Sequence, residues 1–426
     1  MQLNNGRSIR QALAVATCTL LGTAPQSGHA ADNAENWRVD GSILYYSEQD
    51  RVTVIEPVVF ARRTFADDSA LTLRLVYDSM TGASANGATL TNAPQTFTSP
   101  SGTSTYTTPA NQTPLHQFSD QRVALAAEWE KPVNRMRRYV YGATISTEND
   151  YQSFGLSTTL LQDFNDKLST FTAGLAGSYD LVQPIGGVPT PMQLLSTVVP
   201  SSGGDEGGDG GGKGKASLDG IVGFTQVLTR RLLTQFNYSI GYASGYLTDP
   251  YKVLSVVNAT GATVDYRYES RPDTRIRQSL YWKTVYHLPH DVVHFSYRHY
   301  WDDWGVSADT VDLHYRLELW KGSYLQPHVR YATQNAADFY IHSLLNTNPA
   351  PVHASADYRL GDLVTTTVGL KFGLPVGKSS ELSLRVESMT QSGNSHPADA
   401  IGIQKGFDLF PTIHSSIAQL TYTGRF

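Results

Sequence analysis

The feature that most constrains this chain is a strict alternation of apolar and polar residues between positions 275 and 331. In the segment 311–319, every second residue is large and apolar, and the residues between them are Asp312, His314, Arg316 and Glu318. A period of two predicts an extended strand whose side chains alternate between two faces. The segment is longer than most globular strands, and its length suits a tilted crossing of a bilayer.

The neighbouring segments repeat this pattern. Their polar series contains Arg275, Arg277 and Lys283, then His294 and Arg298, then His328 and Arg330, and each series alternates with aromatic and aliphatic residues. One face of every strand suits lipid, whereas the other carries charge that lipid would reject. The pattern predicts an all-β protein, a transmembrane antiparallel β-barrel with a wet interior.

The whole chain divides into about 16 such segments, an even number as single-chain bacterial barrels require. Long polar connections at 82–117, 180–216, 247–273, 335–358 and 391–411 all fall at odd positions in the series, and every even connection is short. A barrel with short periplasmic turns on one rim and long extracellular loops on the other produces this asymmetry. The stretch Gly203–Gly214 has glycine at most positions, and we expect a disordered loop there.

The first 30 residues resemble a secretory signal. Arg7 and Arg10 precede an apolar run, and Gly28-His29-Ala30 offers a small-residue cleavage site. We expect residues 1–30 to be a cleaved signal peptide and residues 31–426 to be the barrel, located in the cell outer membrane. A lipoprotein role for Cys18 is the alternative. Cys18 is the only cysteine, so a mature chain without it excludes disulfides, thiolate metal sites and covalent haem attachment.

The last segment and the composition indicate partners. Residues 413–426 alternate and end on Phe426, which resembles the terminal strand by which barrel-assembly machinery recognises outer-membrane barrels. Besides that machinery, outer-membrane lipid and small solutes are the expected partners. The formal charge is only −5, which argues against a nucleic-acid partner.

Several stretches resemble one bacterial family of outer-membrane barrels, known only as domain of unknown function 3570. They are 75–114 with Phe97–Gly102, 245–257 with Asp249–Ser255, Tyr268–Asp273, 300–315 with Asp302–Gly305, and Ala354–Leu360. The resemblance implies the barrel fold and the outer membrane, and it implies no substrate. The glycine-rich insert falls outside the pattern.

A barrel of this size encloses a water-filled lumen unless loops block it. Short turns would place His294 opposite His314, Ser296 opposite Asp312, Arg316 opposite His328 and Glu318 opposite Gln326. Together with Arg275, Arg277, Lys283, Arg298 and Arg330, these residues predict a mainly cationic lumen wall. Such a wall favours small polar or anionic solutes. The alternative is that the bases pair with lumen acids and make the wall rigid.

Three other hypotheses follow from the residues. His294 and His314 with Asp312 could hold zinc or copper, although ordinary polar lumen residues explain them better, and we expect no cofactor. Ser296, His314 and Asp312 have the types of a hydrolase triad, but no motif supports an enzyme. A barrel that sheathes a periplasmic or surface partner, such as an electron-transfer protein, is the main alternative to a porin-like channel.

The connection 247–273 mixes aromatic, apolar and charged residues, unlike a floppy tract. We expect it to fold into the mouth of the lumen, where Lys252, Arg267 and Arg271 would meet acids of the barrel interior.

Overall fold

The computed structural model describes residues 37–198 and 212–425. The predicted signal peptide, most of the glycine-rich stretch and Phe426 lie outside the described residues. Within the described part of the chain, no helix is long and apolar enough to span a membrane.

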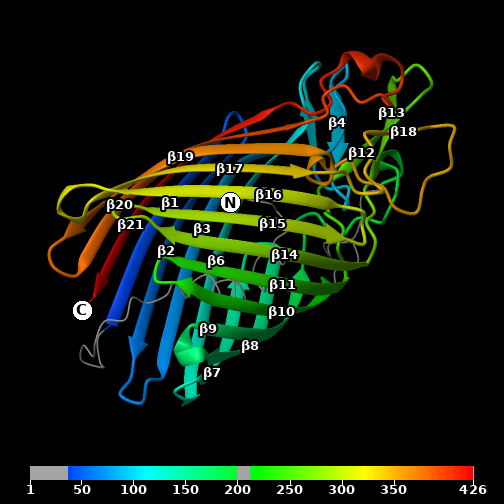
Figure 1. Ribbon diagram of the computed structural model, residues 1–426. Helices are drawn as coiled ribbons and strands as arrows, with labels where there is room; N and C mark the ends of the chain where they lie inside the picture. The colour runs from blue at the N-terminus through cyan, green and yellow to red at the C-terminus, as the bar shows by residue number, and fades with distance from the viewer. Residues whose placement is uncertain (1–36, 199–211, 426) are drawn as a thin grey trace.

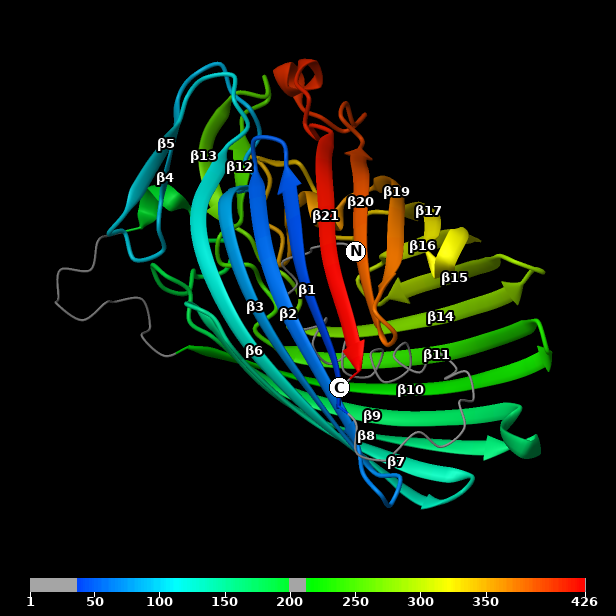
Figure 2. The same ribbon diagram turned by 90° about the vertical axis from the view of Figure 1, so that its left-hand side faces the viewer.

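Sixteen antiparallel strands form a closed barrel, and the last strand pairs with the first to complete the ring (Figures 1 and 2). The strands, in ring order, are β1 (Trp37–Glu48), β2 (Val52–Thr64), β3 (Ala70–Ala85), β6 (Leu115–Asn134), β7 (Arg137–Thr147), β8 (Tyr151–Phe164), β9 (Ser169–Val182), β10 (Lys213–Thr229), β11 (Leu232–Gly245), β14 (Thr274–His287), β15 (Val292–Asp302), β16 (Ser307–Glu318), β17 (Tyr324–Gln334), β19 (Leu363–Val376), β20 (Ser380–Gly393) and β21 (Ile413–Arg425). The predicted architecture and strand number are confirmed.

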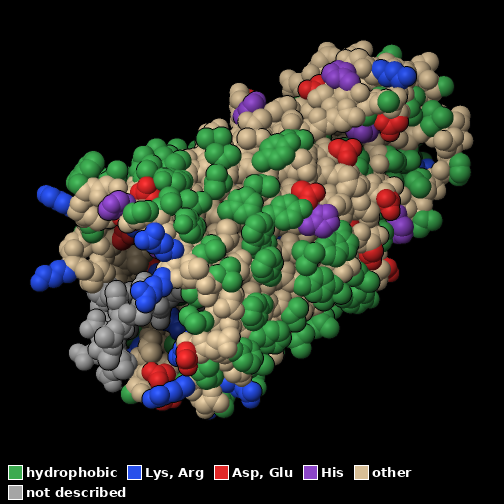
Figure 3. Space-filling view, in the orientation of Figure 1, with side chains coloured by type: hydrophobic (Ala, Val, Ile, Leu, Met, Phe, Trp, Pro, Cys, Tyr) green, Lys and Arg blue, Asp and Glu red, His purple; other side chains and the backbone are tan. Residues whose placement is uncertain are grey.

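The two faces of each strand separate as the alternation predicts. On β14 and β16 the outward Leu280, Trp282 and Leu313 are exposed, while the inward Arg277 and Asp312 are buried. Hydrophobic side chains cover the barrel wall, and Lys and Arg gather at the end with the short turns (Figure 3). An apolar exterior around a charged interior is the inverse of a soluble protein and matches a lipid-embedded barrel.

As predicted, every connection at one end is short, and all the long ones lie at the other end (Figure 1). The strands, however, extend further into two of the long tracts than the sequence indicated. β3 and β6 continue to Ala85 and back from Leu115, and the tract between them contains a hairpin, β4 (Gln95–Thr98) with β5 (Thr105–Thr108). The predicted glycine-rich loop ends too late, because Lys213 and Gly214 already pair with β9 in the barrel.

The long connections fold together into a cap over their end of the barrel. Its centre is a small sheet in which β12 (Val253–Val257) lies between β13 (Thr263–Tyr268) and β18 (Ser343–Leu345). All five residues of β12 are buried, and Leu254 packs against Ala354 and Ala356 of the β17–β19 connection. Three short 3-10 turns lie in the long connections: η2 (Leu195–Thr197), η4 (Tyr358–Leu360) and η5 (Gly402–Gly406). Two others, η1 (Asn165–Lys167) and η3 (Trp320–Gly322), lie in short connections at the other end.

The connection 246–273, which carries β12 and β13, crosses the mouth of the barrel. It leaves the ring between β11 and β14, yet Lys252 Nζ reaches Ser84 Oγ at 3.3 Å, at the end of β3. In the ring order, β3 lies near the side opposite β11 and β14. The same connection also bonds the β20–β21 connection, where Ile403 N donates to the Thr260 carbonyl at 2.9 Å.

Candidate functional site: the lumen wall and its cap

The inner face of β14 to β17 carries the residues that the sequence assigned to the lumen. The predicted pairing of β15 with β16 is confirmed, because His294 lies opposite His314 and Ser296 opposite Asp312. The predicted pairing of β16 with β17 is wrong by two residues, because His328 lies opposite His314 instead of Arg316. The cause is the turn: Lys321 and Gly322 both adopt positive φ, so the connection closes between Leu319 N and the Ser323 carbonyl.

Most of the predicted wall bases form ion pairs with inward acids. Arg275 contacts Asp302, Arg277 Nη2 lies 3.2 Å from Asp219 Oδ1, Arg316 Nε lies 2.6 Å from Glu318 Oε1, and Arg330 Nε lies 2.6 Å from Asp312 Oδ2. These pairs balance the charge along much of the wall. The geometry therefore agrees with the alternative in which bases and acids brace the barrel interior.

Two bases of this wall stand apart from the pairs. Lys283 on β14 and Arg298 on β15 form no ion pair with any other described residue. Lys283 lies opposite Ser296, and Arg298 is two residues further along the same inward face. Arg298 is exposed although it faces inward, and its guanidinium lies 5.5 Å from the centre of the Tyr300 ring. The two side chains therefore place positive charge that is not held in an ion pair on the inward face of the wall.

A second cationic group lies nearer the short turns, and part of it was not predicted from the sequence. Lys371 on β19 and Arg385 on β20 face each other in the strand pairing. Arg316 on β16 and Lys371 both lie over the ring of Tyr324, at 3.6 Å and 5.5 Å from its centre. The signal was present, since both missed residues alternate with apolar neighbours in segments read as strands.

The histidines form a different cluster from the one predicted. His314 and His328 stack with ring centres 4.0 Å apart and planes 9° apart. The Nε2 atoms of His314 and His328 lie 2.8 Å and 3.1 Å from the two carboxylate oxygens of Asp312. On the other side of His328, Nδ1 lies 2.8 Å from Glu387 Oε1. His294 is not part of this group, whose ligand atoms come from Asp312, His314 and His328.

Glu387 reaches His328 across an intervening strand. His328 pairs with Gly369 of β19, and Gly369 pairs with Glu387 of β20. A Cβ at Gly369 would lie 2.4 Å from Glu387 Cγ. The glycine therefore leaves the space through which the carboxylate approaches the imidazole.

Ser296 does not complete a hydrolase triad. It lies opposite Asp312 in the strand pairing, and its side chain hydrogen-bonds Tyr281. His314 Nε2 instead contacts Asp312. Among the residues that the structure describes, nothing joins Ser296 to a general base.

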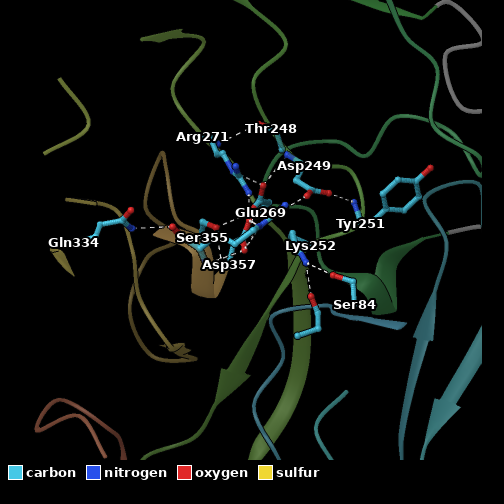
Figure 4. Close-up of polar contacts among 12 residues, drawn as sticks. Ser84, Thr248, Asp249, Tyr251, Lys252, Glu269, Arg271, Gln334, Ser355 and Asp357 are labelled. Carbon is cyan, nitrogen blue, oxygen red and sulfur yellow. Dashed lines mark hydrogen bonds and ion pairs between the residues drawn. The ribbon is translucent and has the colours of Figure 1, made fainter. Parts of the chain in front are cut away.

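The cap contains a buried network of three acids and three bases from two connections (Figure 4). Arg359 bridges Asp357 and Asp249, with Nη2 2.7 Å from Asp249 Oδ2, and Arg271 bridges Glu269 and Asp357 at 2.6 and 2.8 Å. The side chains of Glu269 and Asp357 are fully buried. Lys252 is the third base and reaches the rim of β3. Breaking such a network leaves an uncompensated buried charge.

The electrostatics of the network follow from burial and from its ion pairs. Burial alone would raise the pKa of Asp357, but Arg359 and Lys252 outweigh it and hold that pKa well below its usual range. The pKa of Asp249 is lowered in the same way, since Arg359 and Lys252 outweigh its burial. For Glu269 burial prevails over Arg271, and its pKa is raised. Burial likewise lowers the pKa of Lys252.

The three residues predicted to plug the lumen occupy the cap, but they do not meet acids of the barrel interior. Arg271 pairs with the cap acids Glu269 and Asp357. Arg267 donates to the Met192 carbonyl in the β9–β10 connection at 2.5 Å. Lys252 bonds Ser84 Oγ and the Ala85 carbonyl. The prediction of their partners was wrong because the loop builds its own core and carries its acids with it.

The closed ring, apolar exterior and charged interior define an outer-membrane β-barrel. The chain belongs to the family described as protein of unknown function (DUF3570), which it matches over residues 10–424. A comparison with curated proteins finds no match.

Several solved outer-membrane structures are similar to this chain at low identity. They include a bacterial polysaccharide outer membrane secretin (11% identity, TM-score 0.43, covering 93% of this chain and 100% of that one) and OccK5 (OpdH) of Pseudomonas aeruginosa (9%, 0.39, 92% and 98%). The CymD monoaromatic hydrocarbon channel is also similar (10%, 0.38, 93% and 89%).

Proposed function

We propose that this barrel is an outer-membrane channel for small polar solutes and that it favours anions. The observation that carries the proposal is that two cations, Lys283 and Arg298, on the inward face of β14 and β15 are not held in ion pairs with described residues. An ion passing a wet lumen meets these charges without a carboxylate in direct contact with them. The paired bases along the rest of the wall keep the lumen hydrated and polar.

The cap sets the size limit in this proposal. Because residues 246–273 cross the mouth and bond the four other long connections, a solute has to pass between or beneath these loops. Long extracellular loops that fold over a barrel commonly restrict its opening. A wide solute would therefore need the cap to move, whereas a small one would not.

The test is a reversal-potential measurement on purified protein in planar bilayers under a potassium chloride gradient. Wild type should prefer chloride. A lumen charge a few ångströms from an ion in water contributes about 1 kcal/mol or less. Lys283→Gln with Arg298→Gln should therefore lower the chloride preference several-fold.

The matched control is Lys378→Gln, which removes the same charge from the exposed turn between β19 and β20. It should leave selectivity unchanged. A cation-selective wild type, or an equal effect of the control and the double variant, would contradict the proposal.

A further inference from the structure

The cluster of Asp312, His314 and His328 has the composition and convergence of a metal site. The three residues sit on the inward faces of β16 and β17, two rigid neighbouring strands. All their ligand atoms lie within 4.8 Å of one another. Two imidazole nitrogens and a carboxylate oxygen are the donor set that zinc and related divalent cations accept.

The hydrogen bonding of His328 also indicates that a cation lies in this cluster. A neutral imidazole carries one N–H and one lone pair. If Nδ1–H donates to Glu387, the lone pair on Nε2 points at Asp312 Oδ2, 3.1 Å away. Two lone pairs facing each other repel, so a cation has to lie between them, either a proton on His328 or a metal ion.

We infer that Asp312, His314 and His328 bind a divalent transition-metal cation of the zinc type. A proton would be held by His328 alone, while His314 could donate its own N–H to Asp312. A metal ion would instead be held by both imidazoles that converge on this carboxylate. Glu387 then acts as the outer partner that fixes the His328 ring, as carboxylates do behind histidine ligands in metalloproteins. The inference is independent of which solute the channel passes.

The site is open to the lumen on one side. The His314 side chain is 27% exposed, whereas Asp312 and His328 are at 10% and 6%. Three protein ligands and an accessible fourth position are typical of zinc sites that bind water or a second ligand. A lumen ion could therefore enter, and a small anion could join it.

Arg330 distinguishes a metal site from a cluster that is held together by hydrogen bonds alone. Its Nε lies 2.6 Å from Asp312 Oδ2, so it competes with a cation for that oxygen. A site built for metal should bind more tightly when this positive charge is removed. A cluster held together by hydrogen bonds alone should only lose stability.

The test is calorimetric titration of Zn²⁺ into folded protein that carries no histidine tag, in detergent at neutral pH after chelator treatment. Wild type should bind one Zn²⁺ per chain. His314→Ala and His328→Ala should each abolish that binding, and Glu387→Gln should weaken it roughly 10–100-fold. Arg330→Gln should strengthen it.

The matched control is His294→Ala, which removes a lumen histidine that pairs with His314 but lies outside the cluster. It should bind Zn²⁺ as wild type does. Each variant is first shown to be folded by its heat-dependent shift in electrophoresis. If His328→Ala does not fold, His314→Ala gives the same readout from a more exposed position. Absence of binding to folded wild type, binding retained without His314, or loss in the His294 variant would overturn the inference.

Discussion

Gly369 shows how a residue without a side chain allows residues of the two flanking strands to contact each other in the lumen wall. It sits between His328 and Glu387 in the pairing of β17, β19 and β20, and it has no side chain to separate them. A larger residue there would push the carboxylate away from the imidazole. Here two residues on alternate strands contact each other because the residue between them has no side chain.

We expect Gly369→Ala to lower the free energy of unfolding by about 1–3 kcal/mol, the usual cost of overpacking. The added Cβ would lie 2.4 Å from Glu387 Cγ. Gly41→Ala on β1 is the control, since nothing lies within 4 Å of its added Cβ. Urea unfolding in phospholipid vesicles measures both, and an equal cost at the two positions would refute the argument.

At the scale of the elements, the cap depends on its buried charges. Arg359→Met should leave Asp357 and Asp249 without their shared base, and breaking a buried pair of this kind costs about 3–5 kcal/mol. We expect the cap to loosen while the barrel stays folded. The measurements are protease cleavage within residues 246–273 and channel conductance, and both should rise.

Lys405→Met is the control for this variant, because it removes an exposed charge from η5 in the same cap. Neither cleavage nor conductance should change in it. If Arg359→Met behaved like Lys405→Met, the network would not be what holds the cap closed.

The same network predicts a response to acid. Asp357 and Asp249 have folded pKa values below their ordinary value of about 3.9, so their ionised forms stabilise the cap above that pH, and this stability is lost as the pH falls. Glu269 opposes them, because its raised pKa gives stability that is present at low pH and lost on raising it. Below about pH 4 Glu269 already carries its proton, so the two aspartates decide the change there, and the cap should open as the pH falls further.

Conductance recorded at neutral pH and again near pH 3 tests this expectation. Wild type should conduct more at the lower pH, and Asp357→Asn should conduct more than wild type at neutral pH and change less on acidification. A wild-type conductance that falls or stays constant on acidification would contradict the sign of the argument.

The elements also show which structure could be predicted from sequence. The pairing of β15 with β16 followed from a short turn, and alternation alone placed Asp312 and His314 on the inner face. The pairing of β16 with β17 failed by two residues because the turn, in which Lys321 has positive φ, closes between Leu319 and Ser323, one residue earlier than expected. The same face of each strand stays inward. Burial fixes which face of a strand each residue occupies, whereas the register between two strands depends on the geometry of the turn that joins them.

For the candidate site, the sequence supplied the residues but not all the contacts. Glu387 was missed because it lies two strands from His328 and reaches it only through the gap at Gly369 on the strand between them. The cap network was missed because irregular loops have no period, so Asp357 and Arg271 gave no sign that they meet.

At the scale of the whole molecule, the tryptophans of the closed barrel differ in how much of each side chain is exposed. Trp282 on β14 and Trp129 on β6 project outward, and each is 37% exposed. Trp304, in the β15–β16 connection, is 4% exposed and packs against Val306 and Leu360 beneath the cap. If the apolar exterior faces acyl chains, lipid reaches the first two indoles and not the third.

Brominated phospholipids quench indole fluorescence by contact. The orientation of the barrel wall can therefore be tested with three variants. Each variant retains one of these tryptophans and has the others changed to Phe. In vesicles of brominated lipid, the variants that retain Trp282 or Trp129 should lose much of their emission, and the variant that retains Trp304 should lose little. The variant that retains Trp304 is the control, because it is measured in the same lipid and differs from the other two only in which tryptophan it retains. Strong quenching of Trp304 together with weak quenching of Trp282 would mean that the apolar wall does not face the bilayer, and the lumen assignments of Lys283 and Arg298 would then fail with it.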